Sequence, residues 1–134
     1  MKTIASSREK TKTKGVLIID GDPRVCRVLQ DKFREAGYRA FEASEGQEGL
    51  RQAEKHKPDL IVSEVKLPGM SGAEFLRRLR RKDQQTKVIF TVTAPPDIVD
   101  VHAMHLEFSG FFEKPFDVED LLREIRKAIG KPVS

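Results

Sequence analysis

The sequence predicts an α/β protein in which helices cover both faces of one parallel sheet. Short apolar runs of strand length alternate with segments of helical periodicity, and we count five such pairs between residues 15 and 130. This alternation is typical of right-handed βαβ units, which build doubly wound sheets. We therefore expect a single domain over 15–130, flanked by tails at 1–14 and 131–134, with strand order 2-1-3-4-5.

The first strand and helix have clear boundaries. Residues 16–19 form a wholly apolar, β-branched run, as is usual for a buried parallel strand. Asp22 supplies a side-chain acceptor for the N-cap of the next helix, and Pro23 suits its first turn. Gly37 ends this helix. Cys26 lies among its apolar positions, and we expect an inert, half-buried thiol.

The second strand and helix have a weaker sequence pattern. Residues 39–43 alternate polar and apolar side chains, which indicates an edge strand. Ser44 and Gln47 have the spacing of a capping box and predict the start of the second helix. Pro58 ends that segment.

The middle of the chain predicts two more buried strands. Residues 60–62 form the first of them, and a loop follows at 67–70. Ser71 and Glu74 then form a capping box for the third helix. The apolar run 88–92 predicts the fourth strand.

The last part of the chain completes the pattern. We expect a fourth helix over 97–106 and a fifth strand at 111–112. Asp117 caps the final helix, and Gly130 ends it.

The net charge of +4 belongs to the N-terminal tail. Residues 1–14 hold five basic side chains and one acidic one, so basic and acidic side chains are equal in number in the rest of the chain. A nucleic-acid-binding domain carries its basic patch on folded structure. The arginine-rich segment 77–82 is a candidate, but we interpret it as a solvated helix face and consider nucleic-acid binding unlikely. A single cysteine, no apolar run of membrane-spanning length and no signal-like N-terminus favour a cytoplasmic protein.

Polar side chains close four of the five predicted strands. The working site of an open parallel sheet lies at the carboxyl ends of its strands. We therefore expect a pocket there with carboxylates, one hydroxyl and one lysine. The residues at these ends are Asp20, Gly21, Asp22, Glu64, Thr93, Lys114 and Pro115.

Four segments together resemble the receiver domain of two-component response regulators, which has a flavodoxin-like fold. Each segment alone would be weak, but their combination at this spacing is specific. The resemblance covers residues 15–130. The segments are VLIIDGDP at 16–23, PDLIVSEVKLPGMSG at 58–72, VIFTVTA at 88–94 and FFEKPF at 111–116.

The resemblance implies roles for several residues. Asp20 matches an acid that binds Mg²⁺ in this family, Thr93 the hydroxyl of the switch, and Lys114 the lysine that contacts the phosphoryl group. Phe111 matches the aromatic residue whose rotamer reports the switch. The bond between Lys114 and Pro115 is expected to be cis.

Two departures from the family pattern affect the chemistry. Glu64 stands where the family has its phospho-accepting aspartate, and Gly21 replaces the second member of the acidic pair. Glutamate places its carboxylate about 1.5 Å further out, and a misplacement of about 1 Å can cost about a hundredfold in rate. Asp20, Glu64 and a backbone carbonyl near Lys66 remain as Mg²⁺ ligands, so we expect weak or no binding. Asp22 is favoured as a helix cap.

The longer Glu64 could reach Lys114 or Thr93 directly. We hypothesise a pseudo-receiver, without catalytic activity of its own, that signals by docking to a histidine kinase or a downstream effector and is a monomer or a weak dimer. Three alternatives stay open: a site that is disabled and locked off, a receiver that is still phosphorylated with Mg²⁺, and a fragment of a longer regulator.

Functions of other classes fit less well. The segment at 20–23 is acidic and would repel the phosphate of a nucleotide or flavin. An aspartyl hydrolase would need a cap domain and a second catalytic acid, and a DNA-binding regulator would need an output domain for which 131–134 leaves no room.

Overall fold

The computed structural model describes residues 13–94, 101, 105 and 107–133. Within them, a five-stranded parallel sheet has the order β2-β1-β3-β6-β7, which is 2-1-3-4-5 when its strands alone are numbered along the chain. The predicted α/β, flavodoxin-like architecture is confirmed. The strands are β1 (Gly15–Ile19), β2 (Arg39–Ala43), β3 (Leu60–Glu64), β6 (Lys87–Val92) and β7 (Gly110–Glu113).

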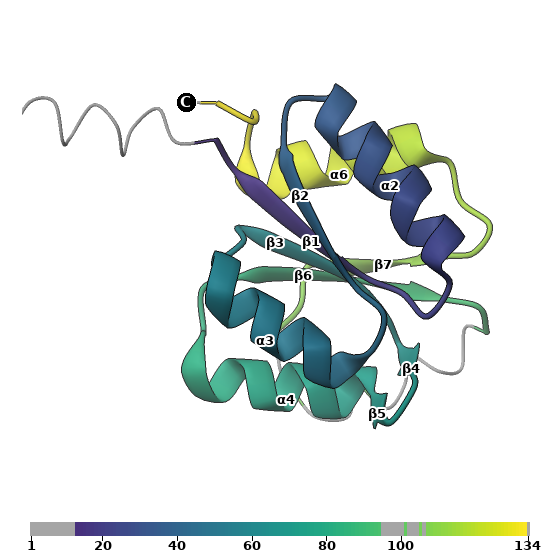
Figure 1. The fold of residues 1–134 in the computed structure, drawn as a ribbon, viewed down its shortest axis with the longest axis vertical. Helices are drawn as coiled ribbons and strands as arrows, with labels where there is room; N and C mark the ends of the chain where they lie inside the picture. The colour runs from purple at the N-terminus through teal and green to yellow at the C-terminus, as the bar shows by residue number, and fades with distance from the viewer. Residues whose placement is uncertain (1–12, 95–100, 102–104, 106, 134) are drawn as a thin grey trace, which may run out of the picture.

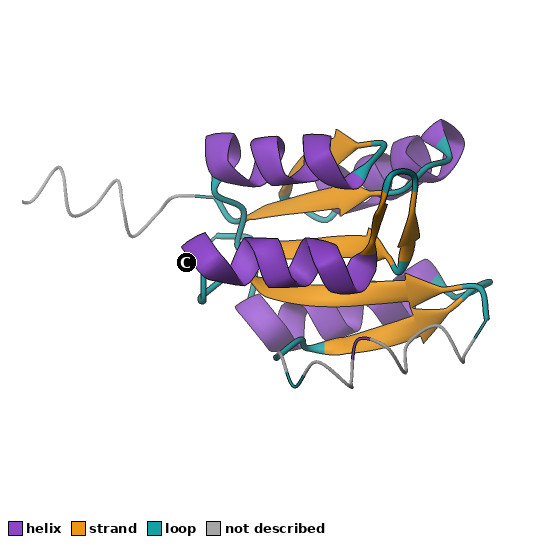
Figure 2. Ribbon diagram, turned by 90° about the horizontal axis from the view of Figure 1, so that it is seen from below, coloured by secondary structure: helices purple, strands orange, loops and turns teal. Residues whose placement is uncertain are grey.

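Helices lie on both faces of this sheet (Figures 1 and 2). Helices α2 (Pro23–Glu35) and α6 (Val118–Ile129) pack on one face, and α3 (Gly46–His56) and α4 (Gly72–Lys82) on the other. The predicted fourth helix at 97–106 falls largely outside the described residues, as does most of the predicted tail at 1–14. Among the described helices, none is long and apolar enough to cross a membrane.

The core consists of two apolar layers, one on each face of the sheet. Successive residues of β1 serve both: Leu17 faces the layer under α3 and α4, whereas Ile18 faces the layer under α2 and α6. Phe75 and Phe33 are fully buried in the two layers. A strand that is covered on both faces needs apolar side chains at every position, which explains the uninterrupted run at 16–19.

Three helix starts follow the local signals. The Asp22 carboxylate accepts a hydrogen bond from the Arg24 backbone N–H at 2.9 Å, with Pro23 in the first turn. Ser71 Oγ accepts from the Glu74 N–H at 3.1 Å. Asp117 caps α6 in the same way. These predictions are confirmed because each cap is made within its own short segment.

The predicted start of α3 is wrong by one position and in its mechanism. The N-cap is Glu45, which makes no side-chain cap bond, and Ser44 instead donates its N–H to the Glu48 carboxylate at 3.0 Å. The helix approaches neighbouring strands very closely, since a Cβ on Gly49 would lie 2.4 Å from Ile19 Cδ1. This close approach leaves no room for a side chain at position 49.

Two further details differ from the sequence-based expectations. The predicted loop at 67–70 contains a small antiparallel hairpin, β4 (Lys66–Leu67) and β5 (Met70–Ser71), which turns through Gly69 at φ +75°. Cys26 is only 1% exposed rather than half-buried, because its helix face packs on the ends of β1 and β2. Its Sγ lies 3.4 Å from the Asp20 carbonyl oxygen, and burial raises the pKa of the thiol to about 12.

Candidate functional site

Three predicted site residues meet at the carboxyl edge of the sheet. Asp20 follows β1, Glu64 ends β3, and Lys114 follows β7. The Lys114 ammonium donates to Asp20 Oδ2 at 2.8 Å and to Glu64 Oε1 at 2.7 Å. One cation therefore joins the ends of three strands.

Asp20 is the most deeply placed member of this group. Its side chain is 4% exposed, whereas those of Glu64 and Lys114 are 23% and 24% exposed. Asp20 Oδ1 accepts the backbone N–H of Asp22 at 2.8 Å, so both carboxylate oxygens have a donor. This N–H contact, which sequence reasoning missed, could have been inferred from the acid two residues before a helix cap.

Burial and neighbouring charges act differently on the pKa values of Glu64 and Lys114. Burial raises the pKa of Glu64, the nearby Asp20 carboxylate raises it further, and Lys114 only partly offsets this. Burial by itself would lower the pKa of Lys114, but its hydrogen bonds to Asp20 and Glu64 outweigh that cost and raise it. Lys114 has two carboxylates beside it, whereas Glu64 shares one ammonium with Asp20. The net effect is a raised pKa for the Glu64 carboxyl in spite of the adjacent ammonium.

The segment after Asp20 contributes no further carboxylate to this group. Asp22 points to the helix start, where its hydrogen bonds with Arg24 lower its pKa, and the two side chains also form an exposed ion pair at 3.2 Å. Gly21 is exposed, and a Cβ at this position would have Pro68 Cγ as its nearest neighbour, at 3.6 Å. Packing therefore leaves room for a side chain at position 21, and the missing acid is not a steric requirement.

Among the described residues, the predicted switch residues take no part in the hydrogen bonds of the charged group. Thr93 is exposed, and among the described residues it makes no hydrogen bond with Glu64 or Lys114. Phe111 pairs in register with Phe90 across β7 and β6 and is 44% exposed. The peptide bond between Lys114 and Pro115 is cis, as the resemblance implied.

The residues of this pocket do not fit a divalent metal well. Mg²⁺ needs near-octahedral oxygen ligands. Both Asp20 oxygens already accept hydrogen bonds, and Glu64 Oε1 faces an ammonium. In the part of the chain that the structure describes, no three His, Cys, Asp or Glu side chains lie together as a metal site.

Comparisons with known proteins agree on one family. A family profile described as "Response regulator receiver domain" matches residues 16–126. Sporulation initiation phosphotransferase F of Bacillus subtilis is 31% identical over 113 residues, which cover 84% of this chain and 90% of that protein. The uncharacterized transcriptional regulatory protein YkoG of Bacillus subtilis is 39% identical over 115 residues, covering 85% of this chain and 50% of YkoG.

The solved structures show the same fold. Chemotaxis response regulator CheY4 of Vibrio cholerae superposes with a TM-score of 0.79 at 27% identity, over 88% of this chain and 100% of that one. The chain spans about half the length of several curated regulators that it matches, YkoG among them. The profile match, the relatives and the shared strand order together show that the chain belongs to the receiver-domain family of two-component response regulators.

Proposed function

We propose that this receiver domain is a pseudo-receiver that signals by docking to other proteins, with weak or no phosphorylation. The observation that supports this most is the contact between Lys114 Nζ and Glu64 Oε1 at 2.7 Å. Glu64 stands at the phospho-acceptor position of the family and places its carboxylate on the lysine that would otherwise contact a phosphoryl group.

The charge balance of the pocket supports the same proposal. A receiver with three carboxylates needs a divalent cation to relieve their repulsion. Here two carboxylates share the Lys114 ammonium at 2.7 and 2.8 Å, and Asp20 is almost fully buried in that arrangement. Recruiting Mg²⁺ would place a divalent cation beside the Lys114 ammonium, and the two positive charges would repel each other.

The domain would then act as a binding partner rather than as an enzyme. We propose that residues 15–130 form the receiver unit, that it works in the cytoplasm as a monomer or weak dimer, and that its partners are a histidine kinase or a downstream effector. Because several curated relatives are about twice as long, it could also be the receiver part of a longer regulator.

Phosphotransfer from a small donor tests the proposal. The wild-type chain and the double variant Gly21→Asp with Glu64→Asp would be incubated with Mg²⁺ and radiolabelled acetyl phosphate. We expect label on the double variant and almost none on the wild type. Gly21→Asp with Glu64→Asn is the matched control, since it keeps the size of the restored side chain but removes the nucleophile. Space beside Gly21 makes these variants compatible with the fold.

A titration with Mg²⁺ in a calorimeter gives an independent readout. The double variant should bind the ion, and the wild type should give little heat. If the wild type binds Mg²⁺ and takes up label as fast as the double variant, the pseudo-receiver proposal is wrong. The alternative, a receiver that is still phosphorylated, has one observation in its favour: the Glu64 side chain is 23% exposed and accessible to a donor.

A further inference from the structure

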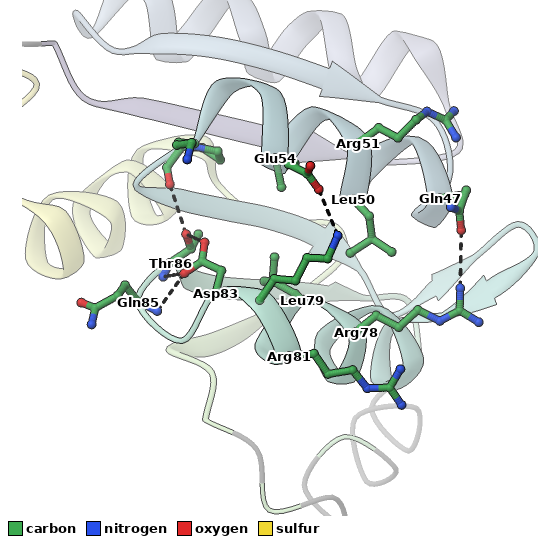
Figure 3. A pocket seen from close by; sticks show the side chains of 14 residues that line it. Gln47, Leu50, Arg51, Glu54, Arg78, Leu79, Arg81, Asp83, Gln85 and Thr86 are labelled. Carbon is green, nitrogen blue, oxygen red and sulfur yellow. Dashed lines mark hydrogen bonds and ion pairs between the residues drawn. The ribbon is translucent and has the colours of Figure 1, made fainter.

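A second hollow lies away from the Glu64 pocket, between α3 and α4. It has a volume of about 740 Å³, which is within the range of ligand sites. Figure 3 shows Leu50 and Leu79 between the two helices. Thr86 and Pro58 line its end near the starts of β6 and β3, which is the edge of the sheet opposite Glu64. We call this hollow the α3–α4 groove.

The rim of the α3–α4 groove is strongly basic. Five basic side chains and two acidic ones line it, which leaves three positive charges uncompensated. Arg51 extends from α3 and Arg81 from α4, on opposite sides of the two leucines in this view (Figure 3). Both are exposed, and among the described residues neither has a carboxylate partner. The lining charges are Arg51, Lys57, Arg78, Arg81, Lys82, Glu54 and Asp83.

The arginine-rich segment of α4 is thus divided into used and unused cations. Arg78 pairs with Glu74 at 2.7 Å, and Arg80 donates to the backbone carbonyls of Asp83 and Glu107. These arginines stabilise the helix and its surroundings. In the described part of the chain Arg81 makes no such contact, so its charge is available to a partner.

Two contacts cross the groove, and both are weak. Lys82 Nζ lies 3.3 Å from Glu54 Oε2, with side chains that are 79% and 71% exposed. Arg78 Nη1 lies 3.5 Å from Gln47 Oε1, at the limit of a hydrogen bond. Exposed pairs of this kind add little to stability, so a ligand could displace them and reach the partly exposed Leu50 and the edge of Leu79, which is 4% exposed.

The closed end of the groove is rigid. Asp83 Oδ1 accepts the N–H groups of Gln85 and Thr86 at 2.8 and 3.0 Å. The Thr86 hydroxyl donates to the Asp83 carboxylate, and its oxygen lies 3.3 Å from the Pro58 carbonyl oxygen. The Asp83 carboxylate therefore faces the backbone of residues 85 and 86 rather than a ligand, which reduces its repulsion of an anion.

We propose that the α3–α4 groove is a docking site for an acidic peptide segment of a partner protein. An apolar side chain of that segment would pack on Leu50 and Leu79, and its carboxylates would lie beside Arg51 and Arg81. Charge complementarity identifies this occupant, and the apolar floor accounts for the apolar side chain. A single-stranded nucleic acid fits less well, because no aromatic side chain lines the groove for base stacking.

Peptide titrations followed by the amide NMR spectrum of the full chain test this site. The probe is a short synthetic peptide of repeating Glu-Glu-Leu units. One control peptide has Lys in place of Glu, and a second has Ser in place of Leu. We expect shifts confined to α3, α4 and the turn at 83–86 with the probe, weaker binding of the Ser peptide and no binding of the Lys peptide. Added salt should weaken the probe's binding.

Charge reversal gives the decisive comparison. Arg51→Glu with Arg81→Glu should weaken probe binding about tenfold, since two attractions become repulsions. The matched control is Arg27→Glu with Lys131→Glu, which makes the same charge change at two exposed positions outside the groove. It should change binding less than about twofold. Both double variants should keep the wild-type thermal midpoint.

Several results would overturn the proposal. They are no saturable binding of the probe, shifts on another face, equal binding of the Lys peptide, or equal effects of the two double variants. Tighter binding of a single-stranded oligonucleotide in the α3–α4 groove would also overturn it. None of these readouts depends on phosphorylation, so failure here is distinguishable from failure of the pseudo-receiver proposal.

Discussion

Substitution of Lys114 by methionine probes the charged group at the carboxyl edge of the sheet. It keeps most of the side-chain length but removes the ammonium that holds Asp20 and Glu64 at 2.8 and 2.7 Å. Two carboxylates then face each other with no cation, and the deeper one, Asp20, is 4% exposed. We expect a large loss of stability near neutral pH.

The size of this loss of stability follows from the balance between ion-pair attraction and the cost of desolvation. At an effective dielectric constant of about 20, each ion pair contributes about 6 kcal/mol of gross attraction, and desolvation cancels most of it. Breaking a buried pair by removing one partner typically costs about 3–5 kcal/mol. Because Lys114 and Glu64 are about a quarter exposed, we reduce the expected loss in unfolding free energy to about 2–3 kcal/mol.

Urea unfolding at two pH values is the assay. Near pH 7 the Lys114→Met variant should lose the full amount, which corresponds to about 10 °C in Tm. Near pH 5 the loss should be smaller, since the pKa of Glu64 is raised and its protonation removes one of the two facing charges. Lys127→Met is the control, because Lys127 forms an exposed pair with Glu124 at 3.5 Å. If both variants are equally stable at both pH values, this account of the site is wrong.

Three other substitutions or reactions test separate features. Gly72→Ala should lower the unfolding free energy by about 1–3 kcal/mol, because its Cβ would lie 2.8 Å from the Val65 carbonyl oxygen. Gly21→Ala is the control and should change the unfolding free energy little. Equal effects of the two substitutions in urea melts would contradict the close packing at Gly72. The pKa of Glu64 is raised in the folded state, so its contribution to stability is full below its ordinary pKa and is lost as pH rises through the higher folded value. The stability of wild type minus that of Glu64→Gln should therefore fall as pH rises above the ordinary glutamate pKa, and a rise would refute the direction. Cys26, with a pKa of about 12, should resist iodoacetamide near pH 8 until the chain unfolds, and fast alkylation of the native protein would show that it is not buried.

Local signals in the sequence were sufficient for most of the fold. The structure confirms the caps at Asp22 and Ser71 and the stop at Gly37, which depend on interactions within a few residues. It also confirms the strand at 16–19, whose apolar run reflects burial on both faces of the sheet. The start of α3 was predicted wrongly because the Ser44 N–H pairs with Glu48 rather than Gln47, and the N-cap residue Glu45 makes no side-chain cap bond. The β4–β5 hairpin was missed because two-residue strands have no periodicity to detect.

The chemistry of the pocket was determined largely by the sequence alone. Residue types at strand ends, together with the rule that parallel strands end at one edge, already implied that Asp20, Glu64 and Lys114 meet and that position 21 lacks an acid. Only the tertiary structure decided that Glu64 contacts Lys114 rather than Thr93, and how deeply Asp20 is buried.

The physical reason is the distance along the chain between the groups involved. Lys114 and Asp20 are 94 positions apart, and their contact depends on how several strands and loops pack. The α3–α4 groove likewise arises where two separate helices face each other, so neither helix has a pattern that predicts it. Side-chain type is a property of the sequence, whereas reach, burial and the shape of a hollow are properties of the packed molecule.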